Sequence, residues 1–150
     1  MNALKWGVVV ALALASFAAP VRAANDGAAR PSIKSVLGWW HGKSDCVVKG
    51  GPCHDEIVQY HFEPIADQPD SLRLTADKVV AGRFETMGVF NVGYSPARRT
   101  WAAEFSNSRV HVLWSYRIRG RELIGTLFGL TDSSVLRHAS LTRGPGVVPR

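Results

Sequence analysis

The chain lacks every short motif that identifies a common catalytic fold. It has no Gly-x-Ser-x-Gly nucleophile elbow, no His-Glu-x-x-His zinc motif, no Walker phosphate loop and no dinucleotide-binding glycine pattern. It has only two cysteines, Cys46 and Cys53, and no Asn-x-Ser/Thr glycosylation site. These absences argue against the commonest hydrolases, zinc proteases and nucleotide-dependent enzymes. We therefore expect a protein that is not an enzyme and that has no cofactor and no metal.

Long apolar runs are equally scarce, because only residues 6–19 form one, and it directly follows Lys5. This run is shorter than the roughly 20 residues that a membrane-spanning helix needs. Val21-Arg22-Ala23 then offers small residues to a signal peptidase, so residues 1–23 are predicted to be a cleaved export signal. We expect a soluble periplasmic or secreted protein without a transmembrane segment after cleavage, in a compartment where disulfides persist.

The sequence also lacks a block of basic residues. Loss of Lys5 and Arg22 with the signal lowers the 18 basic residues to 16 against 12 acidic ones, and the net charge from +6 to +4. The arginines are spread along the chain, a pattern that argues against nucleic acid as a partner.

Helical periodicity is absent from residues 39–142, which alternate between apolar and polar positions in short stretches broken by turn residues. We predict eight strands, near 39–48, 54–63, 71–80, 84–92, 99–105, 109–119, 122–129 and 134–142. Their connections are too short for crossover helices, so sequential strands should pair antiparallel. An up-and-down barrel is favoured because closure removes both sheet edges, and a β-sandwich is the alternative. The barrel domain should span 36–143, between flexible tails at 24–35 and 144–150.

The pairing of the strands can be predicted for two hairpins. A two-residue turn at Gly120-Arg121 pairs apolar residues with one another, namely Ile118 with Leu123, Tyr116 with Gly125 and Trp114 with Leu127. Between strands 54–63 and 71–80, matching the apolar faces pairs Phe62 with Leu72, Tyr60 with Leu74 and Val58 with Ala76. This second register brings Glu56 opposite Lys78, which predicts an inward or rim ion pair between them.

The two cysteines are expected to form a disulfide that closes the first hairpin, worth roughly 2–3 kcal/mol for so short a loop. A redox pair is the less favoured alternative, because the spacing is not Cys-x-x-Cys. His54, Asp55, Glu56 and His61 invite a metal interpretation. On a strand, however, His54 and Glu56 share one face and His61 lies on the other, so surface histidines are favoured.

One short motif resembles a known family. Gly38-x-Trp40, at the start of the first strand of a predicted eight-stranded barrel, is similar to the motif of the lipocalins and the wider calycin group. The resemblance implies that Trp40 plugs the closed end of the barrel and that an arginine from near the last strand lies across its ring. Arg137 is the preferred match because it shares a strand face with Ala139 and Leu141, and Arg143 is the alternative.

The core also resembles a group of small exported bacterial proteins of unknown function. The shared pattern here is Trp40-x-Gly42, the cysteine pair, Asp55-Glu56, Ala76-Asp77-Lys78 and Arg137. Because the core is short for a lipocalin, we expect a narrow barrel that is filled or holds a small ligand.

Three functions remain open. In the first, the barrel binds a small apolar ligand, and the candidate ligand-binding residues are Tyr60, Leu74, Phe90, Trp101, Trp114 and Tyr116. Core packing explains the same residues equally well. In the second, the exterior is a protein-binding or inhibitor module of the cell envelope, with Arg98, Arg99, Arg117 and Arg119 as its basic surface. In the third and least favoured, Glu56 and Lys78 carry out acid–base chemistry.

Overall fold

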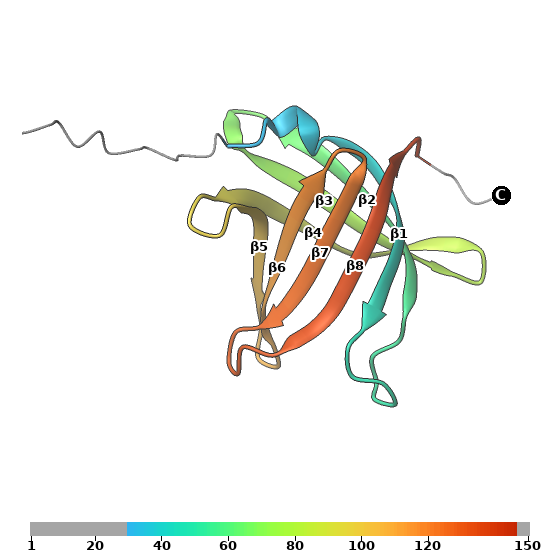
Figure 1. The fold of residues 1–150 in the computed structure, drawn as a ribbon. Coiled ribbons are helices and arrows are strands. Elements are labelled where there is room, and N and C mark those ends of the chain that lie inside the picture. Colours follow the sequence, from blue (N-terminus) through green and yellow to red (C-terminus); the bar gives the residue numbers. More distant parts are fainter. Residues whose placement is uncertain (1–29, 147–150) are drawn as a thin grey trace, which may run out of the picture.

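The computed structural model describes residues 30–146, which form one closed barrel of eight antiparallel strands (Figure 1). Each strand pairs with the next along the chain, and the last pairs with the first. The up-and-down barrel is thereby confirmed over the sandwich, whereas the predicted signal at residues 1–23 lies outside the described residues. The elements are η1 (Ile33–Ser35), β1 (Gly38–Cys46), β2 (Glu56–Ile65), β3 (Gln68–Val80), β4 (Arg83–Ser95), β5 (Thr100–Ser106), β6 (His111–Arg119), β7 (Glu122–Gly129) and β8 (Val135–Gly144).

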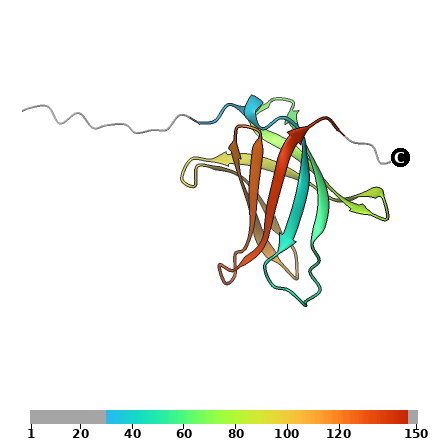
Figure 2. The same cartoon turned by 45° about the vertical axis from the view of Figure 1, so that its right-hand side comes forward.

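The two ends of the barrel differ in what covers them. The short helix η1 lies at one end together with the β2–β3 and β6–β7 turns, and we call this the closed end (Figures 1 and 2). The β1–β2, β5–β6 and β7–β8 loops lie at the other, open end, while the β3–β4 hairpin projects to the side. No helix within residues 30–146 is long and apolar enough to cross a membrane.

Part of the predicted N-terminal tail packs against the closed end. The guanidinium of Arg30 forms an ion pair with Asp70 and lies 5.3 Å from the ring centre of Trp101 and 5.5 Å from that of Tyr94. Ordered contacts with the barrel therefore begin before residue 36.

The predicted register of the β6–β7 hairpin is confirmed. Ile118 pairs with Leu123, Tyr116 with Gly125 and Trp114 with Leu127. Gly120 has a φ of 60°, a conformation that glycine adopts without strain in a two-residue turn.

The predicted register of β2 and β3 is wrong by two residues. Phe62 pairs with Leu74 and Tyr60 with Ala76, so Val58 rather than Glu56 stands opposite Lys78. The cause is the turn, because β2 runs on to Ile65 and β3 already begins at Gln68. Side chains alternate with a period of two, so a two-residue shift keeps every apolar side chain on the same face. The apolar pattern therefore could not distinguish the two registers.

Trp40 seals the closed end, as the resemblance implied. Its side chain is fully buried, and its indole Nε1 donates a hydrogen bond of 2.8 Å to the carbonyl of Val36, which follows η1. The arginine across the ring is Arg143, whose guanidinium carbon lies 4.4 Å from the ring centre. Arg143 also donates hydrogen bonds to the carbonyls of Leu37 and Ser35.

The preference for Arg137 as this partner was wrong because of the β1–β8 register. Arg143 stands directly opposite Trp40, whereas Arg137 stands opposite Cys46 at the far end of β1. The two arginines share the inner face of β8 but reach opposite ends of the barrel.

Gly42 allows β1 to approach β8. A Cβ atom at this position would lie 2.0 Å from the carbonyl oxygen of Ser140, far inside van der Waals contact. The glycine of the Trp40-x-Gly42 pattern is therefore a requirement of barrel closure.

We predict that Trp40→Ala lowers the free energy of unfolding by about 3–5 kcal/mol, as expected for a fully buried aromatic side chain. Trp39→Ala is the control, because Trp39 is only partly buried and stacks on His61 with ring centres 3.8 Å apart. Urea titration of both variants measures the difference. A loss below about 1 kcal/mol for Trp40→Ala would contradict its role as a seal.

Candidate functional site

The six candidate ligand-binding residues all belong to the barrel core or pack against it. Tyr60, Leu74, Trp101 and Tyr116 are at most 2% exposed and fill the barrel as part of its packed core. Phe90 and Trp114 are only partly buried and pack against that core. The structure therefore brings the six together, and their contact with a ligand stays a prediction.

The aromatic side chains of the inner face become more accessible toward the open end. Trp114 stacks on the buried Tyr116, with ring centres 5.5 Å apart and planes 8° from parallel. Phe105, which the sequence analysis did not select, meets Phe90 edge to face at 6.2 Å and is 40% exposed. Its inward orientation follows from its register, because it stands opposite Val112 on the face that also carries Trp114. The open half of the barrel thus presents aromatic surface that its own core does not cover.

The wall of the barrel is weakest between β4 and β5. Only three residue pairs join these strands, whereas every other neighbouring pair is joined over six or more. Extending the same register would place Phe90 directly opposite Phe105, and it is their rings that make contact there. We call the part of the β4–β5 boundary that lacks main-chain pairing the slit. The side chains of Phe90 and Phe105 bridge it.

Arg137 organises the polar contacts at the open end. Its Nη2 donates to the Glu56 carboxylate at 2.9 Å, and its Nε donates to the Ser44 hydroxyl at 3.0 Å. Further donors reach the carbonyls of Ser44 and His54 and the sulfur of Cys53. Glu56 is thus paired with Arg137 and not with Lys78, whose cross-strand neighbours are Val58 and Glu85. These contacts tie β8 to both β1 and β2.

Burial affects the pKa of two tyrosines inside the barrel. Burial raises the pKa of Tyr60 above its usual value, and the hydroxyl of Tyr60 hydrogen-bonds Ser44. Burial likewise raises the pKa of Tyr116.

The predicted disulfide between Cys46 and Cys53 is confirmed, and it closes the loop beside Arg137. Asp55 supports this loop by accepting hydrogen bonds from the Lys49 ammonium at 2.7 Å and from the Cys46 N–H at 2.8 Å. These bonds lower the pKa of Asp55, with Lys49 making the larger contribution. The disulfide indicates an oxidising, extracytoplasmic compartment.

The structure does not bring the metal-site candidates together. Asp55 pairs with Lys49 and Glu56 with Arg137, while His61 stacks on Trp39. Within residues 30–146 no three metal-ligating side chains form a group.

The basic residues of the exterior are only partly gathered. Arg98 and Arg117 line one groove, and Arg117 and Arg119 line a second groove that adjoins it. Arg99 lies in the β4–β5 loop with a φ of 54° and lines neither.

No family model, no curated protein and no solved structure matches the chain. The structure shows an eight-stranded closed barrel with a buried tryptophan and an arginine across its ring at one end. No match places the chain in the lipocalin or calycin group.

We predict that Arg137→Met lowers the free energy of unfolding by about 3–5 kcal/mol, because it leaves the Glu56 carboxylate and several carbonyls without their donor. Adding Glu56→Leu should recover much of this loss, and a double-mutant cycle in urea measures the coupling. Lys49→Met is the control, since its ion pair with Asp55 is exposed and is worth about 0–1 kcal/mol. Equal losses of unfolding free energy for Arg137→Met and Lys49→Met would contradict the claim that Arg137 stabilises the open end more than an exposed ion pair does.

Proposed function

We propose that this protein binds a small, uncharged, apolar molecule in the open half of its barrel, outside the cytoplasm. The observation that carries the proposal is the gradient of exposure along the inner face. Tyr116 is 1% exposed, Trp114 is partly buried, and Phe105 is 40% exposed. A bound apolar molecule would cover this aromatic surface, and each Å² removed from water contributes about 25 cal/mol.

The packing of the closed half limits the size of the ligand. Trp40, Trp101, Tyr60 and Tyr116 are essentially inaccessible and occupy the interior there. The ligand would therefore lie near the open end and contact Trp114, Phe90 and Phe105. A flat ring system suits these side chains, because aromatic rings favour offset stacking and edge-to-face contacts.

The polar groups at the same end favour an uncharged ligand. The Arg137 guanidinium and the Glu56 carboxylate already bind one another, and the other donors of Arg137 bind main-chain carbonyls and Ser44. A ligand carboxylate would have to displace Glu56 to reach Arg137. Recognition would thus depend mainly on apolar contacts.

The slit between β4 and β5 gives the open half freedom to adjust. These strands pair only from Gly93 to Ser95 and from Thr100 to Ala102, so they can move apart at Phe90 and Phe105 without breaking main-chain pairing. We infer that β4 and β5 move apart at the slit when the ligand enters.

The proposal includes no catalytic step. The pair considered for acid–base chemistry is not assembled, because Glu56 binds Arg137 and Lys78 faces Val58. The disulfide supports a periplasmic or secreted location, in which such a protein would carry or sequester its ligand.

A second candidate function, a protein-binding module of the envelope, is favoured by the basic groove on the outside of the barrel.

The test uses N-phenyl-1-naphthylamine, an uncharged aromatic probe whose fluorescence rises in apolar surroundings. We expect saturable binding that Phe105→Ala weakens at least fivefold, because the substitution removes aromatic surface from the proposed site. Phe128→Ala is the matched control, since Phe128 is partly buried on the outer face of β7. No binding, or equal losses in the two variants, would contradict the proposal.

A further inference from the structure

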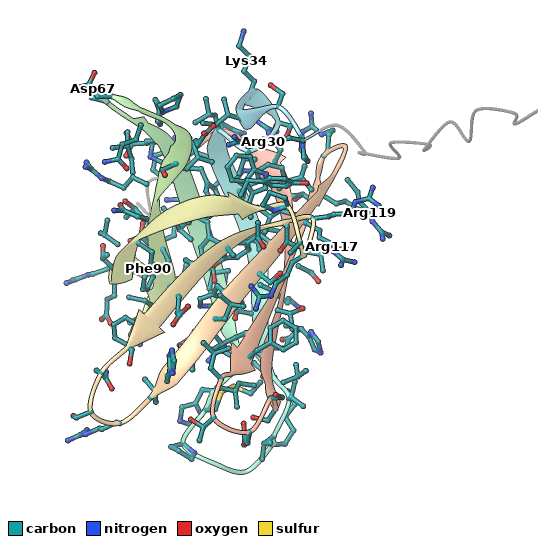
Figure 3. All side chains as sticks on the ribbon, turned by 90° about the vertical axis from the view of Figure 1, so that its left-hand side faces the viewer. Arg30, Lys34, Asp67, Phe90, Arg117 and Arg119 are labelled. Carbon is teal, nitrogen blue, oxygen red and sulfur yellow. A yellow bond between two sulfur atoms is a disulfide. The ribbon has the colours of Figure 1, made fainter. Side chains whose placement is uncertain are left out.

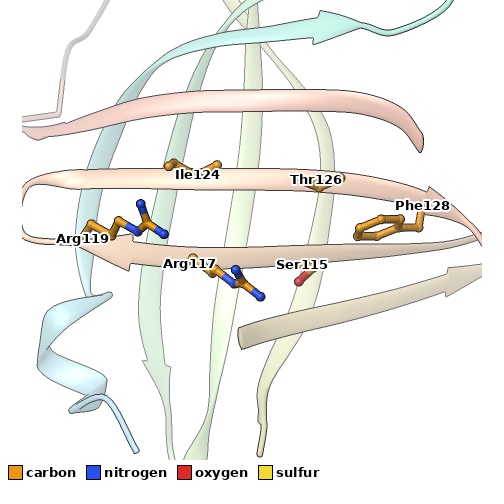
Figure 4. A pocket seen from close by; sticks show the side chains of 6 residues that line it. All are labelled: Ser115, Arg117, Arg119, Ile124, Thr126 and Phe128. Atoms are coloured by element: carbon orange, nitrogen blue, oxygen red, sulfur yellow. The ribbon is translucent and has the colours of Figure 1, made fainter. Parts of the chain in front are cut away.

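A groove runs along the outer face of the barrel over β6 and β7. Figure 4 shows Arg117 and Arg119 on β6 beside Ile124, Thr126 and Phe128 on β7. Next to it, a wider groove of about 490 Å³ extends toward the β4–β5 loop, which contributes Ala97 and Arg98 to its lining. The two share Ser115, Arg117 and Phe128, so they form one continuous depression, which we call the outer groove.

The floor of the outer groove is apolar although it lies on the outside of the wall. Leu113 points outward from β6 and yet is only 6% exposed. Phe128 stands opposite it on β7 and is partly buried, as is Leu130. An apolar floor inside a polar rim is typical of a surface that binds a partner.

The rim of the outer groove is cationic and unpaired. Arg98 and Arg117 are exposed, and neither forms an ion pair within residues 30–146. Arg119 lies further along the same edge, where Glu122 stands opposite it in the register. Figure 3 shows Arg117 and Arg119 projecting side by side from the wall of the barrel. The rim therefore carries positive charge that the described part of the chain does not neutralise.

The groove also contains a buried polar atom without a partner. Thr100 lines the groove and is 3% exposed, and its hydroxyl oxygen has no hydrogen-bond partner in the described residues. A bound segment that reached this hydroxyl would supply the missing hydrogen bond.

We propose that the outer groove binds an extended acidic segment of a partner protein, whose carboxylates and one apolar side chain lie on the same face of the extended chain. Arg117 and Arg119 are two residues apart on one strand, which places their Cα atoms about 6.6 Å apart. Alternate side chains of an extended peptide have the same spacing and share one face, so two carboxylates two residues apart would meet Arg117 and Arg119. An apolar residue four positions before the first carboxylate lies on the same face and would reach Leu113 and Phe128. An anionic lipid has its charge at one end and would leave part of this row unpaired.

The site lies outside the barrel and does not depend on the ligand proposed for the interior. Arginine and aromatic side chains are the residues that contribute most to protein–protein affinity. The substitutions that test it are on the exposed outer face and leave the interior unchanged.

The test measures binding of a fluorescein-labelled peptide of sequence Leu-Ser-Ser-Ser-Glu-Ser-Glu-Ser, whose leucine and two glutamates share one face when extended, to the full-length protein by fluorescence anisotropy. We expect saturable binding that weakens with added salt, because exposed charges are screened. Arg117→Glu should weaken it at least tenfold. Arg83→Glu makes the same charge change at the distant β3–β4 hairpin and should alter the affinity less than twofold.

The proposal is overturned if the peptide does not bind, or if the two glutamate variants lose affinity equally. It is also overturned if phosphatidylglycerol vesicles or a single-stranded oligonucleotide bind through Arg117 while the peptide does not. Circular dichroism of both variants verifies that they remain folded.

Discussion

The seam between β1 and β8 closes the barrel, and two arginines on β8 secure its two ends. The strands approach so closely that Gly42 has no room for a side chain against Ser140. At the closed end Arg143 covers the Trp40 ring and binds the carbonyls around η1. At the open end Arg137 joins β8 to Ser44 of β1 and Glu56 of β2. Each guanidinium satisfies several acceptors at once, as its rigid fork of donors allows.

This arrangement divides the interior into a filled half and an accessible half. From Tyr60 and Tyr116 to the closed end, the aromatic core is inaccessible to solvent. Trp114 and Phe105 lie toward the open end and are partly accessible. The two regions share strand β6, which carries Trp114 on its inner face and Leu113, in the outer groove, on its outer face. The two proposed binding surfaces therefore lie on opposite sides of one wall, one apolar and one cationic.

Much of this architecture could be predicted from the sequence because it depends on local patterns. Alternation and turn residues predicted the eight strands, and Gly120 fixed the β6–β7 register. The β2–β3 register failed because a shift of two residues preserves the apolar faces, and only the length of the Ala66-Asp67 turn decides between them. The charge match of Glu56 with Lys78 was therefore fortuitous.

The roles of the two arginines required the closed barrel. Arg143 meets Trp40, and Arg137 meets Glu56, only after β8 has paired with β1, strands that are about 100 residues apart in the chain. Phe105 was missed for a similar reason, since its contact with Phe90 crosses a slit that strand periodicity does not reveal. Contacts between residues that are far apart in the sequence depend on the fold and leave no local signal.

The central claim is that the accessible half of the interior binds an apolar ligand while the closed end stays sealed. The indole N–H signals of Trp40, Trp101 and Trp114 in a ¹⁵N–¹H spectrum test it during titration with N-phenyl-1-naphthylamine. The account predicts that the signal of Trp114 shifts with saturation, while that of Trp40, hydrogen-bonded to Val36, does not move. No shift of Trp114 at saturating probe, or a larger shift of Trp40, would contradict it.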